Sequence, residues 1–433
     1  MTIWPFSPME NNLHIASGEG VYLTTRDGQK IIDAAGGAIV VNIGHGRTEV
    51  AEAVARTTGQ STYIVPPFLT DERIALVERL QRDWLPPTLT RINMTCGGSE
   101  GVESAMTMAI KYHAAQGRRN KHKIVGRSIS YHGTTLATAA VGGHVARKKD
   151  LAHALPTYPS TLTPYPLRCP SDDPRAYYVD AFRQTLSDEG PDTVAAFLSE
   201  PIVGSSGGAI VPPDGYWEDI QTICREHDIL LIMDEVMTGF GRTGLDFGYQ
   251  HWGIEPDILV SGKGLAGGYS PLAGIFATEA VATAIESGGM SIMFHTYGAH
   301  SAGCAAANVV LEILRRENLV ERAAEKGKIL SELLEKKFSS HPHIAETRGR
   351  GLLQAIEIVR DRDTLEPFDI DANLAYNVMF EALSRGVFVY AGGTGVVRDI
   401  VCLGPPFIVE DDELEVIVDT LAESVDSVIA KLN

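Results

Sequence analysis

The sequence contains few cysteines for its length, with five in 433 residues and no Cys-x-x-Cys pair among them. Zinc sites and redox motifs commonly use such closely spaced pairs, and secreted disulfide frameworks usually have an even number of cysteines. The five scattered cysteines therefore indicate a reducing compartment and exclude a disulfide framework. They also predict that the chain has no metal site.

Basic residues are also scarce, since 37 lysines and arginines face 55 aspartates and glutamates and the formal net charge is −18. This charge argues against nucleic acids and anionic membranes as partners. No apolar run reaches the ~18 residues of a membrane-spanning helix. The N-terminus lacks a basic segment followed by an apolar core, so no signal peptide is expected and the predicted location is the cytoplasm.

Strand and helix patterns alternate from residue 91 onward, which predicts an α/β fold with a mostly parallel sheet covered by helices. Strands are predicted at residues 123–125, 194–199, 229–233, 257–261 and 272–278. Helices are predicted at residues 48–60, 71–84, 216–227, 302–317 and 319–338. Six prolines between residues 155 and 175 instead predict a long irregular loop, which is a common place for function or interfaces.

The two ends of the chain carry a different pattern, which predicts a second and smaller α+β domain. Near the N-terminus, Asp27-Gly28 between alternating segments predicts a hairpin turn. In the C-terminal part, strands are predicted at 351–359, 387–391 and 400–403, followed by a helix at 411–432. We therefore expect residues 60–330 to form a large domain, and residues 1–59 and 331–433 to form the small one.

Two predicted strands lead to residues of opposite charge. The apolar run 229–233 leads to Asp234, and the strand 257–261 leads to Lys263 in a glycine-rich turn. In parallel sheets ligands bind at the carboxyl ends of strands, so both residues would reach one crevice. Each residue alone could equally be part of a buried ion pair or a solvated charge. The flanking glycines favour a ligand, because they allow close approach to the backbone.

The chemistry that requires such a pair is that of pyridoxal phosphate. Its aldehyde needs a lysine, and its pyridine nitrogen needs a carboxylate to stay protonated. A competing motif overlaps the same turn, since Gly262-x-Gly264-x-x-Gly267 has the spacing of a dinucleotide fingerprint. That spacing alone is weak evidence. A lysine occupies its second position and no helical pattern follows, which disfavours a nucleotide.

The longer stretch around both residues resembles a known signature. It reads Asp234-Glu-Val-Met-Thr-Gly-Phe-Gly-Arg-Thr-Gly244, then Pro256-Asp-Ile, then Gly262-Lys-Gly-Leu-Ala-Gly-Gly268. This is similar to the class III pyridoxal-phosphate aminotransferases, and weaker similarity covers nearly the whole chain. The resemblance implies fold type I, with a large domain built on a seven-stranded sheet. It also implies that Lys263 is the Schiff-base lysine, that Asp234 is the partner of the pyridinium nitrogen, and that Val236 packs against the ring.

Further cofactor contacts are implied where other segments match the family. Gly98 and Ser99 precede a helical pattern, so they form either a plain cap or an anion site; by resemblance they hold the cofactor phosphate, with Gly97 in place of the family's first serine. Tyr131 precedes His132-Gly133, and an aromatic residue there could simply belong to the core. The resemblance implies that its ring stacks on the pyridine ring.

Two more segments resemble parts of the family's site. Glu200 matches a carboxylate placed near the cofactor, and its role is left open. Thr296 matches a threonine that reaches the phosphate of the neighbouring subunit's cofactor. The resemblance therefore implies a homodimer with shared active sites.

The substrate end of the site distinguishes branches of the family. Met237 stands where many members have glutamine, and Cys402 stands where a fixed arginine precedes the pair Pro405-Pro406. Arg398 lies just upstream, which resembles the mobile arginine of the ω-amino acid or amine:pyruvate transaminases, although it could be a surface residue paired with its neighbour. Ile39 stands where those enzymes often have tryptophan, which implies an aliphatic pocket wall.

The implied function is transfer of an amino group from an amine or ω-amino acid to a keto acid such as pyruvate, by ping-pong kinetics. The same fold also hosts decarboxylating transaminases of the dialkylglycine decarboxylase type, to which the segment 205–208 is similar, and aminomutases and racemases. A non-catalytic cofactor- or amine-binding protein is the alternative from another class.

Overall fold

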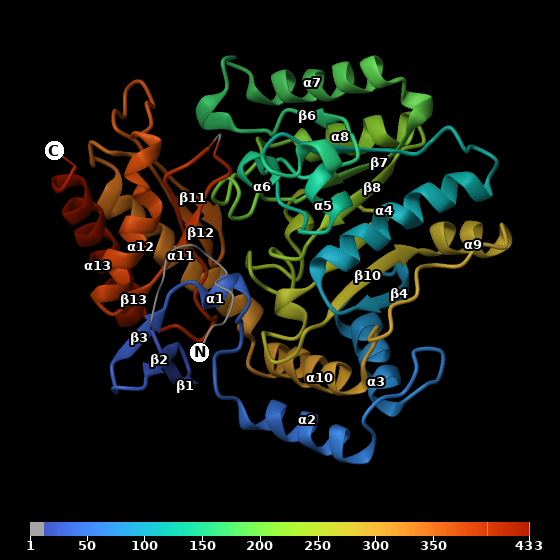
Figure 1. Ribbon diagram of the computed structural model, residues 1–433, viewed down its shortest axis with the longest axis horizontal. Helices are drawn as coiled ribbons and strands as arrows, with labels where there is room; N and C mark the ends of the chain where they lie inside the picture. The colour runs from blue at the N-terminus through green and yellow to red at the C-terminus, as the bar shows by residue number, and fades with distance from the viewer. Residues whose placement is uncertain (1–12, 396, 433) are drawn as a thin grey trace.

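The centre of the molecule is a seven-stranded sheet, seen in a computed structural model that describes residues 13–395 and 397–432 (Figure 1). The strand order is β4-β10-β9-β8-β7-β5-β6. Only β10 runs antiparallel to its neighbours, and β9, β8, β7, β5 and β6 are mutually parallel. The strands are β4 (Leu89–Thr95), β5 (Lys123–Arg127), β6 (Ser160–Thr161), β7 (Val194–Ser199), β8 (Leu230–Asp234), β9 (Ile258–Ser261) and β10 (Ala273–Thr278). The predicted α/β fold with a mostly parallel sheet is confirmed.

The inner strands are apolar throughout because helices cover both faces of this sheet. Along β8, Leu230 and Ile232 pack on one face with residues of α4 (Gly98–Ala115), whereas Leu231 and Met233 pack in the larger core on the other face. Helices α7 (Pro174–Glu189) and α8 (Tyr216–Glu226) contribute to that larger core. Successive side chains of a strand point to opposite faces, so burial on both faces explains the uninterrupted apolar runs.

Other helices enclose the sheet and connect it to the rest of the chain (Figure 1). Helix α10 packs against α2 and α3 beside the sheet. The remaining helices of this part of the chain are α1 (Gly36–Ile39), α2 (Thr48–Gln60), α3 (Asp71–Arg79), α5 (Leu136–Val141), α6 (Val145–Lys148), α9 (Glu279–Ser287) and α10 (Ser301–Arg316). None of the helices within residues 13–395 and 397–432 has both the length and the apolar character that crossing a membrane requires.

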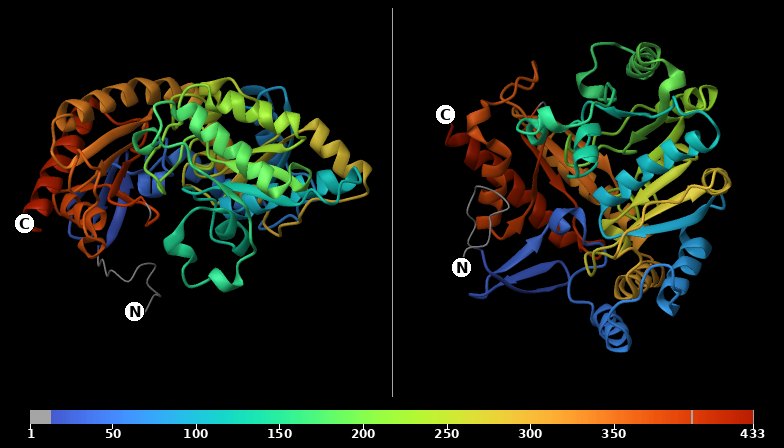
Figure 2. Two further views of the ribbon diagram at one scale, coloured as in Figure 1. Left: turned by 90° about the horizontal axis from the view of Figure 1, so that it is seen from above. Right: turned by 45° about the vertical axis from the view of Figure 1, so that its right-hand side comes forward.

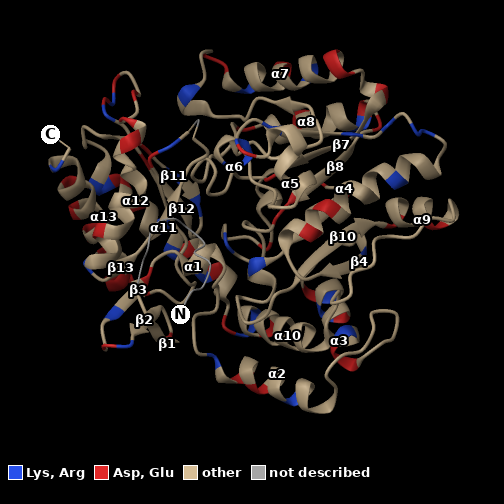
Figure 3. Cartoon of the chain, viewed as in Figure 1, with Lys and Arg blue, Asp and Glu red and all other residues tan. Residues whose placement is uncertain are grey.

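Two smaller four-stranded sheets and the last helices gather at one end of the molecule (Figure 2). One sheet has the order β1-β2-β3-β13 and the other β11-β12-β15-β14. Their strands are β1 (Ile15–Glu19), β2 (Tyr22–Thr25), β3 (Lys30–Asp33), β11 (Ile344–Arg350), β12 (Leu353–Ile358), β13 (Val387–Phe388), β14 (Tyr390–Gly392) and β15 (Ile400–Leu403). The helices are α11 (Leu319–Phe338), α12 (Leu374–Ser384) and α13 (Asp411–Ala430). Acidic residues line much of α13 (Figure 3).

The division of the chain into residues 60–330 and residues 1–59 with 331–433 stays a prediction. Helix α2 packs against α10 rather than against the smaller sheets. Residues 1–12, 396 and 433 of the expected small domain lie outside the described residues.

Some elements differ from the sequence patterns for identifiable reasons. The single strand expected at 387–391 is two strands, because β13 pairs with β3 and β14 pairs with β15 in the other sheet. The proline-rich segment 155–175 is mostly irregular but contributes the short edge strand β6. Strand β11 was not predicted, because charged residues interrupt its apolar pattern. One of them, Arg348, is buried and forms a 2.8 Å ion pair with Glu357.

Candidate active site

Asp234 and Lys263 meet at one edge of the central sheet. Asp234 is the last residue of β8 and is paired in register with Val260 of the parallel strand β9. Lys263 follows the end of β9 by two residues. Both residues line one cavity of about 450 Å³. The structure therefore brings together the acid and the amine that the sequence pattern placed at neighbouring strand ends.

Asp234 is held in a fixed orientation by two hydrogen bonds. Its Oδ2 lies 2.8 Å from Nδ1 of His132, and its Oδ1 accepts a hydrogen bond of 3.1 Å from the backbone N–H of Val236. The side chain of Asp234 is almost fully buried. Nε2 of His132 is buried and has no hydrogen-bond partner among the described residues. This arrangement presents an oriented carboxylate to the cavity, supported from behind by a histidine.

Lys263 combines an unusual backbone conformation with a perturbed amine. Its φ of +37° lies in the left-handed region, which is uncommon for non-glycine residues. Burial lowers the pKa of Lys263 to about 8, and the nearby carboxylates of Asp234 and Glu200 oppose this decrease. At neutral to mildly basic pH the amine can therefore both accept and donate a proton.

Glu200 positions the aromatic side of the cavity. Its Oε1 accepts a hydrogen bond of 2.8 Å from the backbone N–H of Gly204, and its Oε2 accepts one of 3.2 Å from the backbone N–H of Tyr131. Burial raises the pKa of Glu200. Beneath it, the fully buried Arg127 donates a hydrogen bond of 2.5 Å to the carbonyl of Glu200. Glu200 thus fixes the backbone that carries Tyr131 in the cavity wall.

The N-terminus of α4 forms another part of the cavity. Gly98 begins this helix, and Gly97, Gly98 and Ser99 line the cavity. A Cβ atom at Gly98 would lie 3.0 Å from a methyl group of Val236, so glycine permits the close approach of helix and valine. The free N–H groups and the dipole at a helix N-terminus favour a phosphate. A cavity with an oriented acid, a lysine, an apolar valine, an aromatic wall and an anion site fits pyridoxal phosphate.

Comparison with known proteins assigns the family. Residues 6–425 match the family described as aminotransferase class-III. The chain is a class III aminotransferase. Members of this family depend on pyridoxal phosphate, so Asp234, Lys263, Val236, Gly98 and their neighbours are the residues available to hold it.

Individual relatives resemble this aminotransferase over almost its whole length. The uncharacterized aminotransferase YodT of Bacillus subtilis (strain 168) is 34% identical over 426 residues, which cover 96% of this chain and 95% of that protein. A thermostable (S)-enantioselective omega-transaminase from Thermomicrobium roseum has a TM-score of 0.92 at 32% identity, over 98% of this chain and 96% of that chain. The omega transaminase from Pseudomonas jessenii in complex with PMP has a TM-score of 0.92 at 31% identity, covering 99% and 97%.

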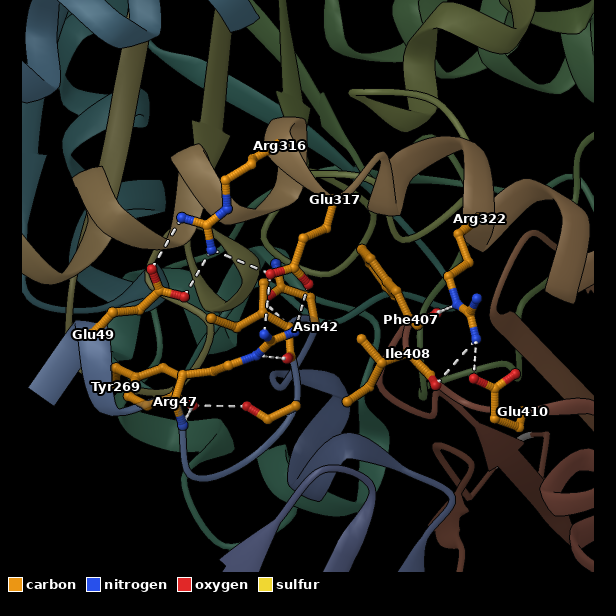
Figure 4. Close-up of polar contacts among 12 residues, drawn as sticks. Asn42, Arg47, Glu49, Tyr269, Arg316, Glu317, Arg322, Phe407, Ile408 and Glu410 are labelled. Atoms are coloured by element: carbon orange, nitrogen blue, oxygen red, sulfur yellow. Dashed lines mark hydrogen bonds and ion pairs between the residues drawn. The ribbon is translucent and has the colours of Figure 1, made fainter.

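A polar network connects the lysine turn of the aminotransferase to the segments around it. The side chain of Asn42 donates a hydrogen bond of 2.9 Å to the carbonyl of Gly264, and the backbone carbonyl of Asn42 accepts one of 2.7 Å from the N–H of Phe407. Tyr269 accepts a hydrogen bond from the N–H of Arg47. Ion pairs extend this network to the junction of α10 and α11 (Figure 4), where they join Arg47 with Glu317, Arg316 with Glu49 and Arg322 with Glu410.

Three residues predicted from the sequence, Thr296, Arg398 and Ile39, do not line the cavity. Thr296 is exposed in the segment after α9, where its carbonyl accepts a hydrogen bond from the hydroxyl of Tyr63. Arg398 lines a different cavity, and its Nη2 donates a hydrogen bond of 2.7 Å to the carbonyl of Phe368. Contact of Arg398 with a substrate carboxylate stays a prediction, and it requires the side chain to leave this position.

Ile39 lies one residue away from the cavity wall, and its contact with a substrate stays a prediction. Its side chain is buried behind the wall, where a Cβ atom at Gly404 would lie 2.9 Å from it, and the adjacent Val40 lines the cavity instead. The sequence pattern cannot show this, because Ile39 has a φ of +57° within an irregular glycine-rich segment. The resulting wall is still aliphatic, as the sequence predicted.

Several lining residues were not predicted as contacts. Ser270, Pro271 and Leu272 follow the glycine-rich turn directly, and this proximity to Lys263 could have identified them. Glu235, next to Asp234, has a structural role instead, because it accepts hydrogen bonds from the backbone N–H groups of Gly248 and Tyr249. Burial raises the pKa of Glu235 to about 7.

The lowered pKa of Lys263 gives a direct prediction. In the cofactor-free protein, competitive acetylation of amines followed by peptide mass analysis should show half-maximal reactivity of Lys263 near pH 8. Burial disfavours the charged ammonium, so the neutral and reactive amine is populated at a lower pH than the ~10.4 of an ordinary lysine. Lys328, whose side chain is 80% exposed, is the internal reference. The same pH dependence at both lysines would contradict this description of the site.

Proposed function

We propose that this aminotransferase transfers an amino group from an amine or ω-amino acid donor to a keto acid such as pyruvate, by ping-pong kinetics. The main support is the composition of the cavity wall. Among the described residues, no arginine lines the cavity, and much of its wall is apolar, including Val40, Met237 and Leu272. Such a wall accepts an uncharged amine without leaving a buried cation unpaired. The likeness to omega-transaminases supports the same conclusion.

The residues of the cavity support this chemistry in distinct ways. When bound, pyridoxal phosphate supplies an electron sink for the carbanion that forms beside the amino group. Lys263, with its pKa lowered by burial, would take the proton from the substrate carbon as base and deliver it as acid to the carbon of the cofactor that carried the aldehyde. Asp234, oriented by His132, would hold the pyridine nitrogen of the cofactor. Glu200 holds Tyr131 in place, and the N-terminus of α4 would hold the phosphate of the cofactor.

The decarboxylating alternative concerns the loop that contains Ser205–Gly208. Ser206 is buried, and its hydroxyl has no hydrogen-bond partner among the described residues. Arg348 donates hydrogen bonds of 2.6 Å to the carbonyls of both Gly207 and Gly208. These hydrogen bonds fix the loop against the smaller sheets. The likeness of this segment to dialkylglycine decarboxylases does not change the proposal.

A donor screen tests the proposed function. The holoenzyme is incubated with pyruvate and either 1-phenylethylamine or β-alanine, and alanine is measured. We expect alanine with at least one donor and no carbon dioxide from 2-aminoisobutyrate. Carbon dioxide from 2-aminoisobutyrate would favour the decarboxylating alternative. No alanine from either donor would contradict the proposed donors and acceptor.

Replacing Asp234 with asparagine should slow the amine half-reaction by roughly a hundred- to several-thousandfold. Removing one partner of a buried charged interaction costs about 3–5 kcal/mol, and each ~1.4 kcal/mol is a factor of ten in rate. Single-turnover absorbance measurements on the loaded Asp234→Asn variant report this rate. Deprotonation at a near-normal rate would exclude the proposed role of Asp234.

We further propose that the aminotransferase acts as a homodimer with shared active sites. The segment that contains Thr296 exposes large apolar side chains, among them Phe294 and Tyr297, which are 62% and 58% exposed. Phe68 and Leu69 are also exposed, by 66% and 78%. Apolar exposure of this extent is typical of protein interfaces. It supports the presence of a partner subunit, whose cavity Thr296 would reach.

Subunit exchange tests the shared sites. The Lys263→Ala and Thr296→Ala variants are each expected to have little activity, and mixing them should restore part of it. In a heterodimer with shared sites, one site carries both substitutions and the other carries neither. Each variant alone, and a pull-down that demonstrates exchange, are the controls. If exchange occurs and activity does not return, the sites are not shared.

A further inference from the structure

The cavity lacks a visible partner for the carboxylate of a keto acid. Asp234 and Glu200, which line the cavity, are acidic and would repel a carboxylate. The amine of Lys263, which also lines it, is needed for proton transfer. A carboxylate therefore requires a cation at the rim of the cavity, at a distance from both acids. This question rests on the proposed function, because it asks how that site recognises its acceptor.

Most arginines close to the cavity are already engaged within the protein. Arg242 donates hydrogen bonds to the carbonyls of Val41, Leu352 and Pro405. Arg348 is paired with Glu357, and Arg127 lies buried beneath Glu200. Arg398 lines the separate cavity described above and not the cavity that contains Lys263.

Arg147 is positioned differently from these arginines. It lies on the short helix α6, which also carries Lys148 and is coloured as basic in Figure 3. Arg147 is exposed. Its guanidinium carbon lies 4.7 Å from the ring centroid of Tyr131, the aromatic residue of the cavity wall. No carboxylate of the described residues forms an ion pair with it within 4.0 Å. A guanidinium held over a ring keeps its N–H donors for a planar, bidentate partner.

Contacts of α6 with neighbouring segments hold Arg147 beside Tyr131. The N–H of Ala146 donates a hydrogen bond of 3.2 Å to the carbonyl of Thr394, which follows strand β14. The ammonium of Lys148 donates one of 2.7 Å to the carbonyl of Ala140 in α5. Tyr390 of β14 is paired in register with Cys402 of β15. Burial raises the pKa of Tyr390, and the charge of Arg147 opposes this increase, as expected of a nearby cation.

We propose that Arg147 is the residue that recognises the carboxylate of the keto-acid acceptor. Its guanidinium, held over Tyr131, binds the carboxylate through charge-assisted hydrogen bonds at the rim. The reacting carbonyl then points inward, toward Lys263. An uncharged amine donor makes no use of this cation and occupies the apolar wall. Arg147 thus separates the two kinds of substrate by charge.

Kinetics with two acceptors that differ in charge test the proposal. In the holoenzyme, Arg147→Ala should lower kcat/KM for pyruvate by roughly ten- to a hundredfold, through KM, as expected for loss of a charged hydrogen bond. The value for the uncharged acceptor propanal should change less than about twofold by the same reasoning. Arg147→Lys should recover part of the loss, because it keeps the charge without the bidentate geometry. Lys149→Ala, at an exposed position just beyond α6, is the matched control and should behave as the wild type.

Two results would overturn the proposal. Equal losses with pyruvate and propanal would show that Arg147 only supports Tyr131. A pyruvate-specific loss in Arg398→Ala, and none in Arg147→Ala, would assign the carboxylate to Arg398.

A binding measurement separates this proposal from the proposed function. The unreactive pyruvate analogue oxamate is titrated into the wild-type and Arg147→Ala holoenzymes by calorimetry. Weaker binding by the variant supports Arg147, even if the donor screen finds no transamination and the proposed function fails. Equal binding by both proteins, or no binding by either, counts against Arg147.

Discussion

The site depends on one constraint: a carboxylate and an amine are held at the ends of two neighbouring strands that are buried on both faces. Strands β8 and β9 cannot shift relative to each other without breaking their parallel pairing, which places Asp234 beside Val260. Helix α4 covers one face of these strands and the larger core covers the other. The same burial that fixes the strands removes water from Lys263 and lowers the pKa of its amine to about 8.

The residues around this pair are arranged to keep it in position. His132 orients Asp234, Glu200 holds the backbone of Tyr131, and Asn42 connects the lysine turn to Phe407 near the smaller sheets. The cavity therefore depends on segments that are far apart in the sequence. Such support from several directions is what keeps catalytic groups in a productive geometry, and it explains how Lys263 retains an unfavourable φ of +37°.

The sequence predicted the parts of the site that follow directly from regular structure. Asp234 and Lys263 could be placed because each follows an apolar strand, and in a parallel sheet both strands end at the same edge. The segments without periodicity were harder. The wall residue is Val40 rather than Ile39, because the irregular backbone at 36–39 decides which side chain faces inward. The position of Arg147 over Tyr131 depends on how α6 docks on the segment after β14, and no local pattern encodes this contact.

We propose that Asp234 and Lys263 together form the cofactor site of this aminotransferase. The most direct measurement is reduction of the loaded protein with borohydride, followed by peptide mapping of the attached pyridoxyl group. We expect one modified peptide, with the group on Lys263, and no stable attachment in the Lys263→Ala variant. Attachment at any other lysine, or unchanged labelling of that variant, would contradict it.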